Sequence, residues 1–168
     1  MKEEIIDGIN YRFDEKTLTS EVIHMDGYKG DIIIPETVVH ESVSYRVTSI
    51  GEDAFAYSDL KSIVIPDSVM IIDGGAFEES HLMSVVIPDS VTIISSHTFE
   101  SCENLLSVVI GKGVMEIYYE VFAGCRALAS ITYNGTMEQW EQIDFAGDDW
   151  NAGVPATVVH CTDGDVEI

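Results

Sequence analysis

Cys102 and Cys125 are the residues of this 168-residue chain with the most specific chemistry, because each follows a phenylalanine by three positions and the matching contexts could bring them together. Neighbouring thiols can form a disulfide or bind a metal ion. Cys161 makes the number of cysteines odd, and no further cysteine and histidine pair has the spacing of a zinc site. We expect Cys102 and Cys125 to be reduced core residues, with a disulfide or a metal pair as the alternative.

A nucleophilic site is suggested by His160, Cys161 and Asp163 near the C-terminus. A catalytic thiol needs a base and an orienting group in a pocket, and a terminal segment offers no such pocket. The sequence also lacks a glycine-rich phosphate loop, a catalytic triad and a metal-binding cluster of recognised spacing. It therefore predicts no catalytic residue, no metal site, no cofactor and no enzymatic activity.

Acidic residues near the C-terminus could supply oxygen ligands to calcium. None of them follows the alternating spacing of a calcium-binding loop, so we expect a solvated acidic surface, and the sequence leaves calcium binding undecided. These residues are Asp144, Asp148, Asp149, Asp163, Asp165 and Glu167.

The elements that must position any site come from a repeat with a period of 22 or 23 residues. A phrase of the type Leu-x-Ser-Ile-Val-Ile-Pro-Asp-Ser-Val begins at Leu60, Leu82, Leu105 and Leu128, and the last copy is incomplete. In step with it, a phenylalanine recurs five residues after an isoleucine. A unit this short cannot bury its own apolar face, so each coil must stack on its neighbours with like residues above one another. The phenylalanines are Phe55, Phe77, Phe99 and Phe122.

Alternation within each copy predicts a strand in which Ile63 and Ile65 point inward while Ser62 and Val64 point outward. The strands should pair in parallel from coil to coil, and the Ala-Phe-x-x-Ser/Cys segment should form a short helical turn on the far side. The outward residues make an uncharged stripe, the candidate ligand-binding face. The competing interpretation is that small and β-branched residues merely suit a parallel sheet. The candidate residues are Ser62, Val64, Ser84, Val86, Ser107, Val109, Ser130 and Thr132.

The whole chain, 1–168, is expected to form one domain of the α/β class: a right-handed β/α solenoid of about four to five coils with a parallel sheet on one face. Residues 1–33 should form an N-terminal cap with a β-hairpin around Asp14-Glu15-Lys16, and residues 34–133 the repeats. Residues 134–168 should form a C-terminal cap and an acidic tail. Thr136 and Gln139 suit a capping box for a helical cap that carries Trp140.

The repeat resembles that of the BspA-like, or Treponema-type, leucine-rich repeat family, which runs Leu-x-x-Ile-x-Ile-Pro-x-x-Val-x-x-Ile-x-x-x-Ala-Phe-x-x-Cys. The similarity covers Ile34 to Tyr133, with Gly111 in place of proline in the third copy. The resemblance implies a leucine-rich-repeat solenoid without catalytic activity. It also implies a bacterial surface or secreted protein of the adhesion type, whose partner is a protein or glycan ligand of the host matrix or cell surface.

Charge narrows the range of partners. The chain has 8 Lys and Arg against 30 Asp and Glu, a formal net charge of −22, and this field repels nucleic acid and anionic membranes. No apolar run approaches the ~20 residues that span a bilayer, so no membrane insertion is expected. The opening Met1-Lys2-Glu3-Glu4 lacks the apolar stretch of a secretory signal, and the sequence alone therefore leaves a cytoplasmic location open.

The function that the sequence favours is a non-enzymatic module that binds a protein or glycan through the strand stripe. The alternative is a structural spacer or stabilising repeat unit of a larger surface protein. The unlike ends of the repeat array argue against a spacer, because an array meant to continue would not be capped. The sequence does not give the ligand, the oligomeric state, or whether the chain is part of a longer one.

Overall fold

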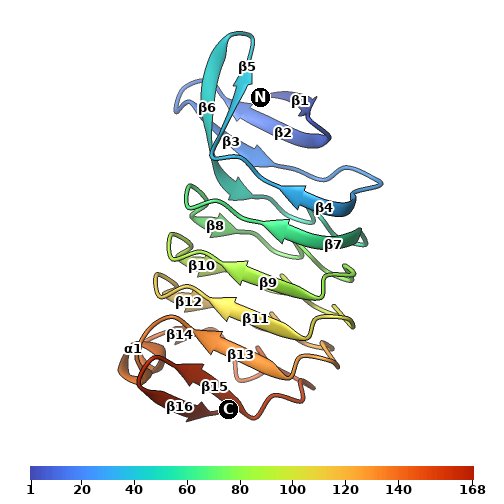
Figure 1. The fold of residues 1–168 in the computed structure, drawn as a ribbon. Coiled ribbons are helices and arrows are strands. Elements are labelled where there is room, and N and C mark those ends of the chain that lie inside the picture. The colour runs from blue at the N-terminus through green and yellow to red at the C-terminus, as the bar shows by residue number, and fades with distance from the viewer.

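The computed structural model describes residues 1–168 as a stack of coils in which the chain alternates between strands on two opposite sides (Figure 1). One side, whose outer surface we call the strand face, consists of β4 (Lys29–Ile33), β7 (Asp59–Val64), β9 (Ser84–Ile87), β11 (Ser107–Ile110), β13 (Ser130–Tyr133) and β15 (Val158–Cys161). The other contains β3 (Thr19–Val22), β6 (Val43–Ile50), β8 (Ile71–Ile72), β10 (Ile93–Ile94), β12 (Glu116–Ile117) and β14 (Asp144–Phe145).

The predicted parallel pairing of the repeat strands is confirmed. β9, β11 and β13 pair in register, so that Ser84, Ser107 and Ser130 lie side by side. β4 pairs with β7 in a separate ladder, and β7 lies beside β9 without a regular ladder between them. Alternation places Ile63 and Ile65 inside, as predicted.

The second sheet was not predicted, and it changes the fold class from α/β to mostly β. Its repeat strands, β8, β10 and β12, are only two residues long and pair in parallel through the buried isoleucines Ile72, Ile94 and Ile117. Two residues are too few to show alternation in a sequence. The solenoid therefore has parallel strands on both sides of one continuous core.

The core phenylalanines stack one above another. Phe77 lies with its ring centroid 5.3 Å from that of Phe55 and 5.1 Å from that of Phe99, with nearly parallel planes, and Phe122 continues the column. The segment around each phenylalanine is not the predicted helical turn. Each coil instead contains two residues with left-handed backbone, such as Asp53 (φ 54) in the first coil. The others are Tyr57, Gly75, Glu79, His97, Ser101, Glu120 and Gly124.

Backbone hydrogen bonds join these turns from coil to coil. The N–H group of a phenylalanine donates to a carbonyl of the following coil: Phe55 to Ala76 at 2.7 Å, and Phe77 to Thr98 at 2.8 Å. The backbone polar groups of the turn segment are satisfied in this way without helix or sheet. A coil without a neighbour on its N-terminal side must therefore leave carbonyl oxygens unpaired.

The N-terminal cap contains the predicted hairpin. β2 (Ile9–Asp14) pairs with β3 in antiparallel fashion around the predicted turn, and β1 (Lys2–Ile6) adds an outer strand. The extra chain between the first half-repeat and the first complete one forms a second hairpin, in which β5 (Thr37–His40) pairs with β6. Figure 1 shows this hairpin projecting at the N-terminal end of the stack.

The C-terminal end differs from the prediction of a helical cap and an acidic tail. The capping box of Thr136 and Gln139 is present, but it begins a helix, α1, of only five residues (Met137–Glu141). The stack is instead closed by a hairpin of β15 and β16 (Gly164–Glu167), with β15 paired in parallel with β13. Trp140 of α1 is buried, as expected, against Tyr133. Local capping starts the helix, while sheet pairing decides how the stack ends.

The turn after β11 explains why the third repeat has glycine where the first two have proline. A Cβ atom on Gly111 would lie 2.5 Å from the backbone of Pro88, and one on Gly113 would collide with the carbonyl oxygen of Asp89. We therefore expect Gly111→Pro, which restores the repeat consensus, to lower the free energy of unfolding by about 2 kcal/mol. Urea unfolding of both proteins measures this difference, and an equal or higher stability of Gly111→Pro would contradict the proposed clash.

Candidate functional site: the strand face

All eight residues predicted to bind a ligand lie on the outer side of the strands. Val64 and Val86 are 54% and 57% exposed, the serines beside them are exposed, and the C-terminal half of the stripe is partly exposed. Parallel register brings equivalent residues together: Val86 pairs with Val109, and Val109 with Thr132. The structure thus assembles the predicted stripe as one continuous surface.

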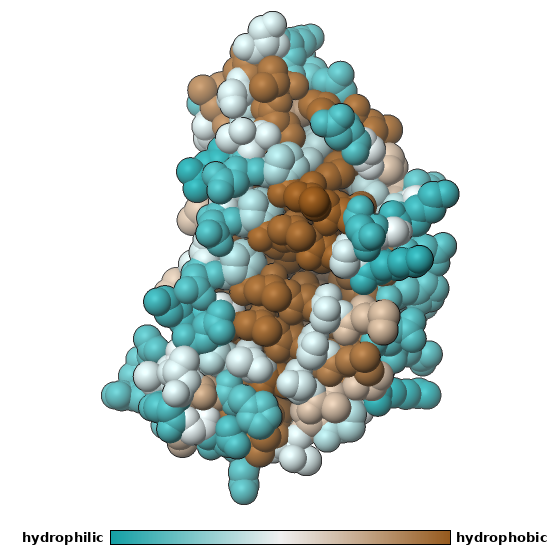
Figure 2. All heavy atoms as spheres, in the orientation of Figure 1, coloured by the Kyte–Doolittle hydropathy of each residue, from teal (hydrophilic) through white to brown (hydrophobic).

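The apolar surface is larger than the sequence indicated. Ile33, 71% exposed, extends the valine row because it pairs with Val64. Met83 and Leu106, 56% and 49% exposed, widen it beside β9 and β11. Figure 2, in the orientation of Figure 1, shows a column of hydrophobic side chains along these strands with hydrophilic side chains on both flanks. A sequence signal existed for Met83 and Leu106, since both precede a stripe serine.

Polar pairs mark the two ends of the stripe. At the N-terminal end the Ser62 hydroxyl donates to Asp31 Oδ1 at 2.7 Å, and at the C-terminal end His160 Nδ1 lies 2.8 Å from Asp165 Oδ1. Between these ends the valine and serine rows contain no Lys, Arg, Asp or Glu, and the nearest charged side chain is the exposed Lys61, which precedes Ser62 as Met83 and Leu106 precede the next two serines. The stripe is therefore an uncharged strip within a strongly acidic surface.

Cys102 and Cys125 are buried free cysteines in successive coils. Their thiols donate to the carbonyl oxygens of Phe77 and Phe99, each at 3.0 Å, in the preceding coil. The neighbouring Cys102 thiol, followed by burial, raises the pKa of Cys125. Both cysteines therefore act as buried hydrogen-bond donors within the core.

The terminal residues considered for nucleophilic chemistry are not assembled for it. His160 pairs with Asp165 and not with Cys161, its neighbour on the opposite face of β15, while Asp163 accepts from the Met137 N–H at 2.8 Å. Burial, followed by the charges of two aspartates, raises the pKa of Cys161 and keeps the thiol protonated. His40, at the N-terminal end of the stack, is buried against Phe13.

No three His, Cys, Asp or Glu side chains converge as metal ligands, and the acidic C-terminal residues that raised the question of calcium are spread over the last coil and hairpin. The five-residue α1 is the only helix, so no helix here has the length to cross a bilayer.

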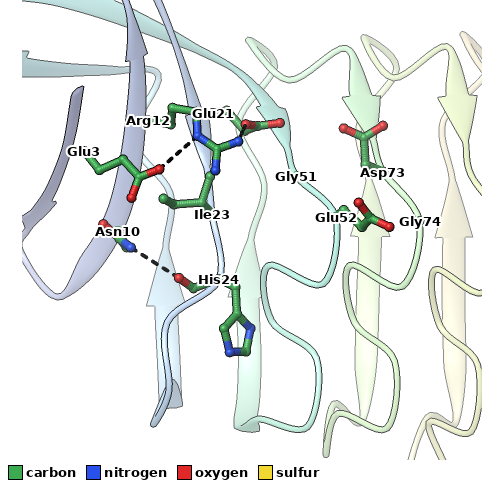
Figure 3. Close-up of a pocket in the computed structure, with 10 residues that line it drawn as sticks. All are labelled: Glu3, Asn10, Arg12, Glu21, Ile23, His24, Gly51, Glu52, Asp73 and Gly74. Atoms are coloured by element: carbon green, nitrogen blue, oxygen red, sulfur yellow. Dashed lines mark hydrogen bonds and ion pairs between the residues drawn. The ribbon is translucent and has the colours of Figure 1, made fainter. Parts of the chain in front are cut away.

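An acidic cleft of about 590 Å³ lies on the other side of the molecule, between the N-terminal cap and the first coils (Figure 3). Arg12 sits between Glu3 and Glu21, 3.1 Å from a carboxylate oxygen of each, while Asp73 and Glu52 have no basic partner there. Burial, followed by repulsion from Glu52, raises the pKa of Asp73. The cleft therefore carries carboxylates that the fold does not neutralise.

Asp73→Asn is expected to stabilise the chain slightly at neutral pH. Because the pKa of Asp73 is raised by folding, its charged form opposes folding above that pKa, and stability rises as the pH falls through it. We expect a gain of about 0.5 kcal/mol at pH 7, small because the side chain is partly solvated. The gain should vanish in acid, where Asp73 is protonated and therefore as neutral as the asparagine that replaces it. Thermal unfolding from pH 3 to 8 tests this, and a pH-independent difference would assign the effect to another cause.

Comparison with known proteins relates the fold to a repeat family. The family model described as BspA type Leucine rich repeat region (6 copies) matches residues 36–149 of this chain. None of the curated proteins compared with this chain matches it.

Two solved structures, the first two described here, show the same fold. The pneumococcal vaccine antigen PcpA has a TM-score of 0.70 at 15% identity, over 97% of this chain and 50% of that one. A leucine-rich repeat protein from Bacteroides capillosus ATCC 29799 has a TM-score of 0.58 at 22% identity, over 96% of this chain and 99% of that one. A leucine rich cell surface protein from Faecalibacterium prausnitzii A2-165 reaches 0.43 at 18% identity, over 79% and 55% of the two chains. This chain thus spans about half the length of the pneumococcal one.

Proposed function

The chain belongs to the BspA-type leucine-rich repeat family, and from this premise we propose that it is a non-enzymatic binding module whose strand face holds its partner. The family consists typically of non-enzymatic binding modules. We also propose a bacterial cell-surface location. The similarity to the pneumococcal vaccine antigen supports this location.

The observation that carries the proposal is the exposed apolar column on a chain of net charge −22. Soluble proteins rarely leave a contiguous apolar strip uncovered, and such strips, when rimmed by polar residues, mark sites of protein association. Val64 and Val86 are both more than half exposed although valine suits burial. The outward positions of the strands require only β-branched residues, and threonine, which occurs at position 132, suits the sheet as well as valine does. Sheet formation alone therefore does not explain why valine stands at the other positions.

The chemistry of the strip favours a protein over a glycan. Its polar groups are the hydroxyls of four serines and Thr132, which are few partners for the many hydroxyls of a sugar, while its apolar side chains suit a complementary apolar patch. Six strands at ~4.8 Å spacing span about 24 Å, and with Met83 and Leu106 the strip still falls short of the ~800 Å² per partner of a standard interface. The partner must also contact the flanking loops.

Binding of the purified chain to a panel of matrix glycoproteins and glycans, at physiological salt, tests the proposal. We expect saturable binding to at least one protein with an affinity in the micromolar range, about 1 to 10 µM, given the modest area. A spacer would bind none of them. Failure across a broad panel would therefore count against the binding module and favour the spacer.

A further inference from the structure

The first coil has an incomplete neighbour on its N-terminal side. The two chain segments are paired at both ends of their connections, since Val22 pairs with Ile50 and Lys29 pairs with Asp59. Between these pairs the N-terminal segment has only the six residues 23–28, whereas the first coil has the eight residues 51–58. The shorter connection cannot cover the longer turn. A cleft of about 570 Å³ remains between them, lined only by residues of these two segments, and we call it the coil-end cleft.

Backbone carbonyl groups at this cleft lack the hydrogen bonds that their equivalents make elsewhere. In the second coil, three turn carbonyls accept from N–H groups of the first coil. They are those of Gly74, Ala76 and Glu78. The corresponding carbonyls of the first coil, those of Glu52, Ala54 and Ala56, accept no hydrogen bond, because the connection 23–28 places no N–H group against them. Glu52 and Ala56 line the cleft.

The Ser58 hydroxyl at this cleft is also unpaired. Cys102 and Cys125, at the equivalent position in later coils, donate to a carbonyl oxygen of the preceding coil. Ser58 is only 5% exposed, lines the cleft, and finds no partner for its Oγ atom. An unpaired polar group this deeply buried is costly, and a ligand that paired with it would remove the cost.

The other side chains of the cleft combine negative charge with aromatic surface. Asp26, Glu52 and Asp53 contribute carboxylates, and no Lys or Arg lines the cleft. The ring of Tyr57 is 67% exposed, and Tyr28 forms part of the wall. His24 is held by the carbonyl oxygen of Asp53, 2.9 Å from Nδ1. The cleft thus offers many acceptors, a negative field and an aromatic face, and the one side chain in it that can carry a positive charge is His24, whose Nε2 lies 3.4 Å from Asp26 Oδ1.

We propose that the coil-end cleft binds a guanidinium group, that of an arginine side chain presented by a partner peptide. A guanidinium carries five N–H donors in one plane, which suits acceptors spread over a carbonyl edge and the three carboxylates of the cleft. Its flat face stacks on an aromatic ring such as that of Tyr57. A metal ion fits less well, because the acidic side chains do not converge as ligands. This site is separate from the strand face.

Titration of the isotope-labelled chain with N-acetyl-arginine methylamide, followed by backbone amide NMR, tests the proposal. We expect saturable shifts confined to residues 23–28 and 51–58, with a Kd of about 1 mM, and at least about fivefold weaker binding of the lysine analogue. Free arginine should bind more weakly, since the cleft repels its carboxylate. Equal binding of lysine would overturn the guanidinium assignment, and tighter binding of free arginine would overturn the peptide assignment.

Two variants separate a binding role from a structural one. Asp26→Asn with Asp53→Asn should weaken binding about tenfold, and asparagine tolerates the left-handed backbone of Asp53. The control pair Asp67→Asn and Asp148→Asn removes the same charge at exposed sites outside the cleft and should change the Kd less than twofold. Ser58→Ala should bind about threefold more weakly with an unchanged or higher Tm. Unaltered binding in Ser58→Ala and the double variant, or equal losses in the control pair, would overturn the proposal.

Discussion

Phe77→Ala is expected to lower the free energy of unfolding by about 4 kcal/mol. Phe77 is fully buried between two stacked phenylalanines, and its truncation leaves a cavity in the middle of the column. The loss of two stacking contacts adds to the cost of the cavity. Because each coil of a solenoid contacts only its neighbours, the cavity also weakens the coupling between the coils on either side. Urea unfolding followed by tryptophan fluorescence measures the change.

The matched control for this prediction is Met115→Ala. Met115 is a large apolar residue of the same solenoid but is 60% exposed, so its truncation should change stability by less than about 0.5 kcal/mol. If Phe77→Ala unfolds in two transitions and Met115→Ala in one, the coils on the two sides of Phe77 unfold separately. A loss below about 1.5 kcal/mol would mean that the column does not stabilise the fold as the stacking suggests.

Replacement of Val64, Val86 and Val109 by glutamate is expected to weaken partner binding at least about 100-fold. The three side chains lie in one row at the centre of the strand face, so three carboxylates there would have to be desolvated against an apolar partner surface. The fold should remain intact, because Val64 and Val86 are exposed and Val109 is partly exposed. Binding isotherms and circular dichroism of both proteins test the two statements.

A second triple variant controls for the added charge. Val39, Met70 and Met115 are 63%, 53% and 60% exposed and lie outside the strand face, so their replacement by glutamate adds the same charge to similarly exposed apolar sites. We expect its affinity to stay within about threefold of that of the unmodified chain, since exposed charges at a distance are screened by salt. Equal losses in the two variants would assign the effect to net charge and not to the face.

The fold was predictable wherever the same residue recurs in every copy. Leu-x-Ser-Ile-Val-Ile fixes a strand, and the phenylalanine that follows fixes the column, because a stacked repeat must place like residues together. The short strands of the second sheet carry no such alternation. The C-terminal hairpin had a signal that the capping box obscured, since Thr157-Val158-Val159-His160 has the character of Ser107-Val108-Val109-Ile110.

The candidate site was predictable only in part. Strand alternation alone located the eight stripe residues, because it sets which side chains point outward. Ile33 was missed since its pairing with Val64 depends on a register shift between Gly30 and Asp31. The coil-end cleft could not be foreseen, because it arises from a difference in length between two connections that only the pairing of the flanking strands reveals.

The most direct test of the central claim is methyl NMR of the valine-labelled chain with the partner found in the binding panel. We expect the partner to shift the methyl signals of Val64, Val86 and Val109. The buried Val69 and Val91 serve as internal references whose signals should move little. Perturbation confined to methyls outside the strand face, with the three stripe valines unchanged, would contradict the claim that this face holds the partner.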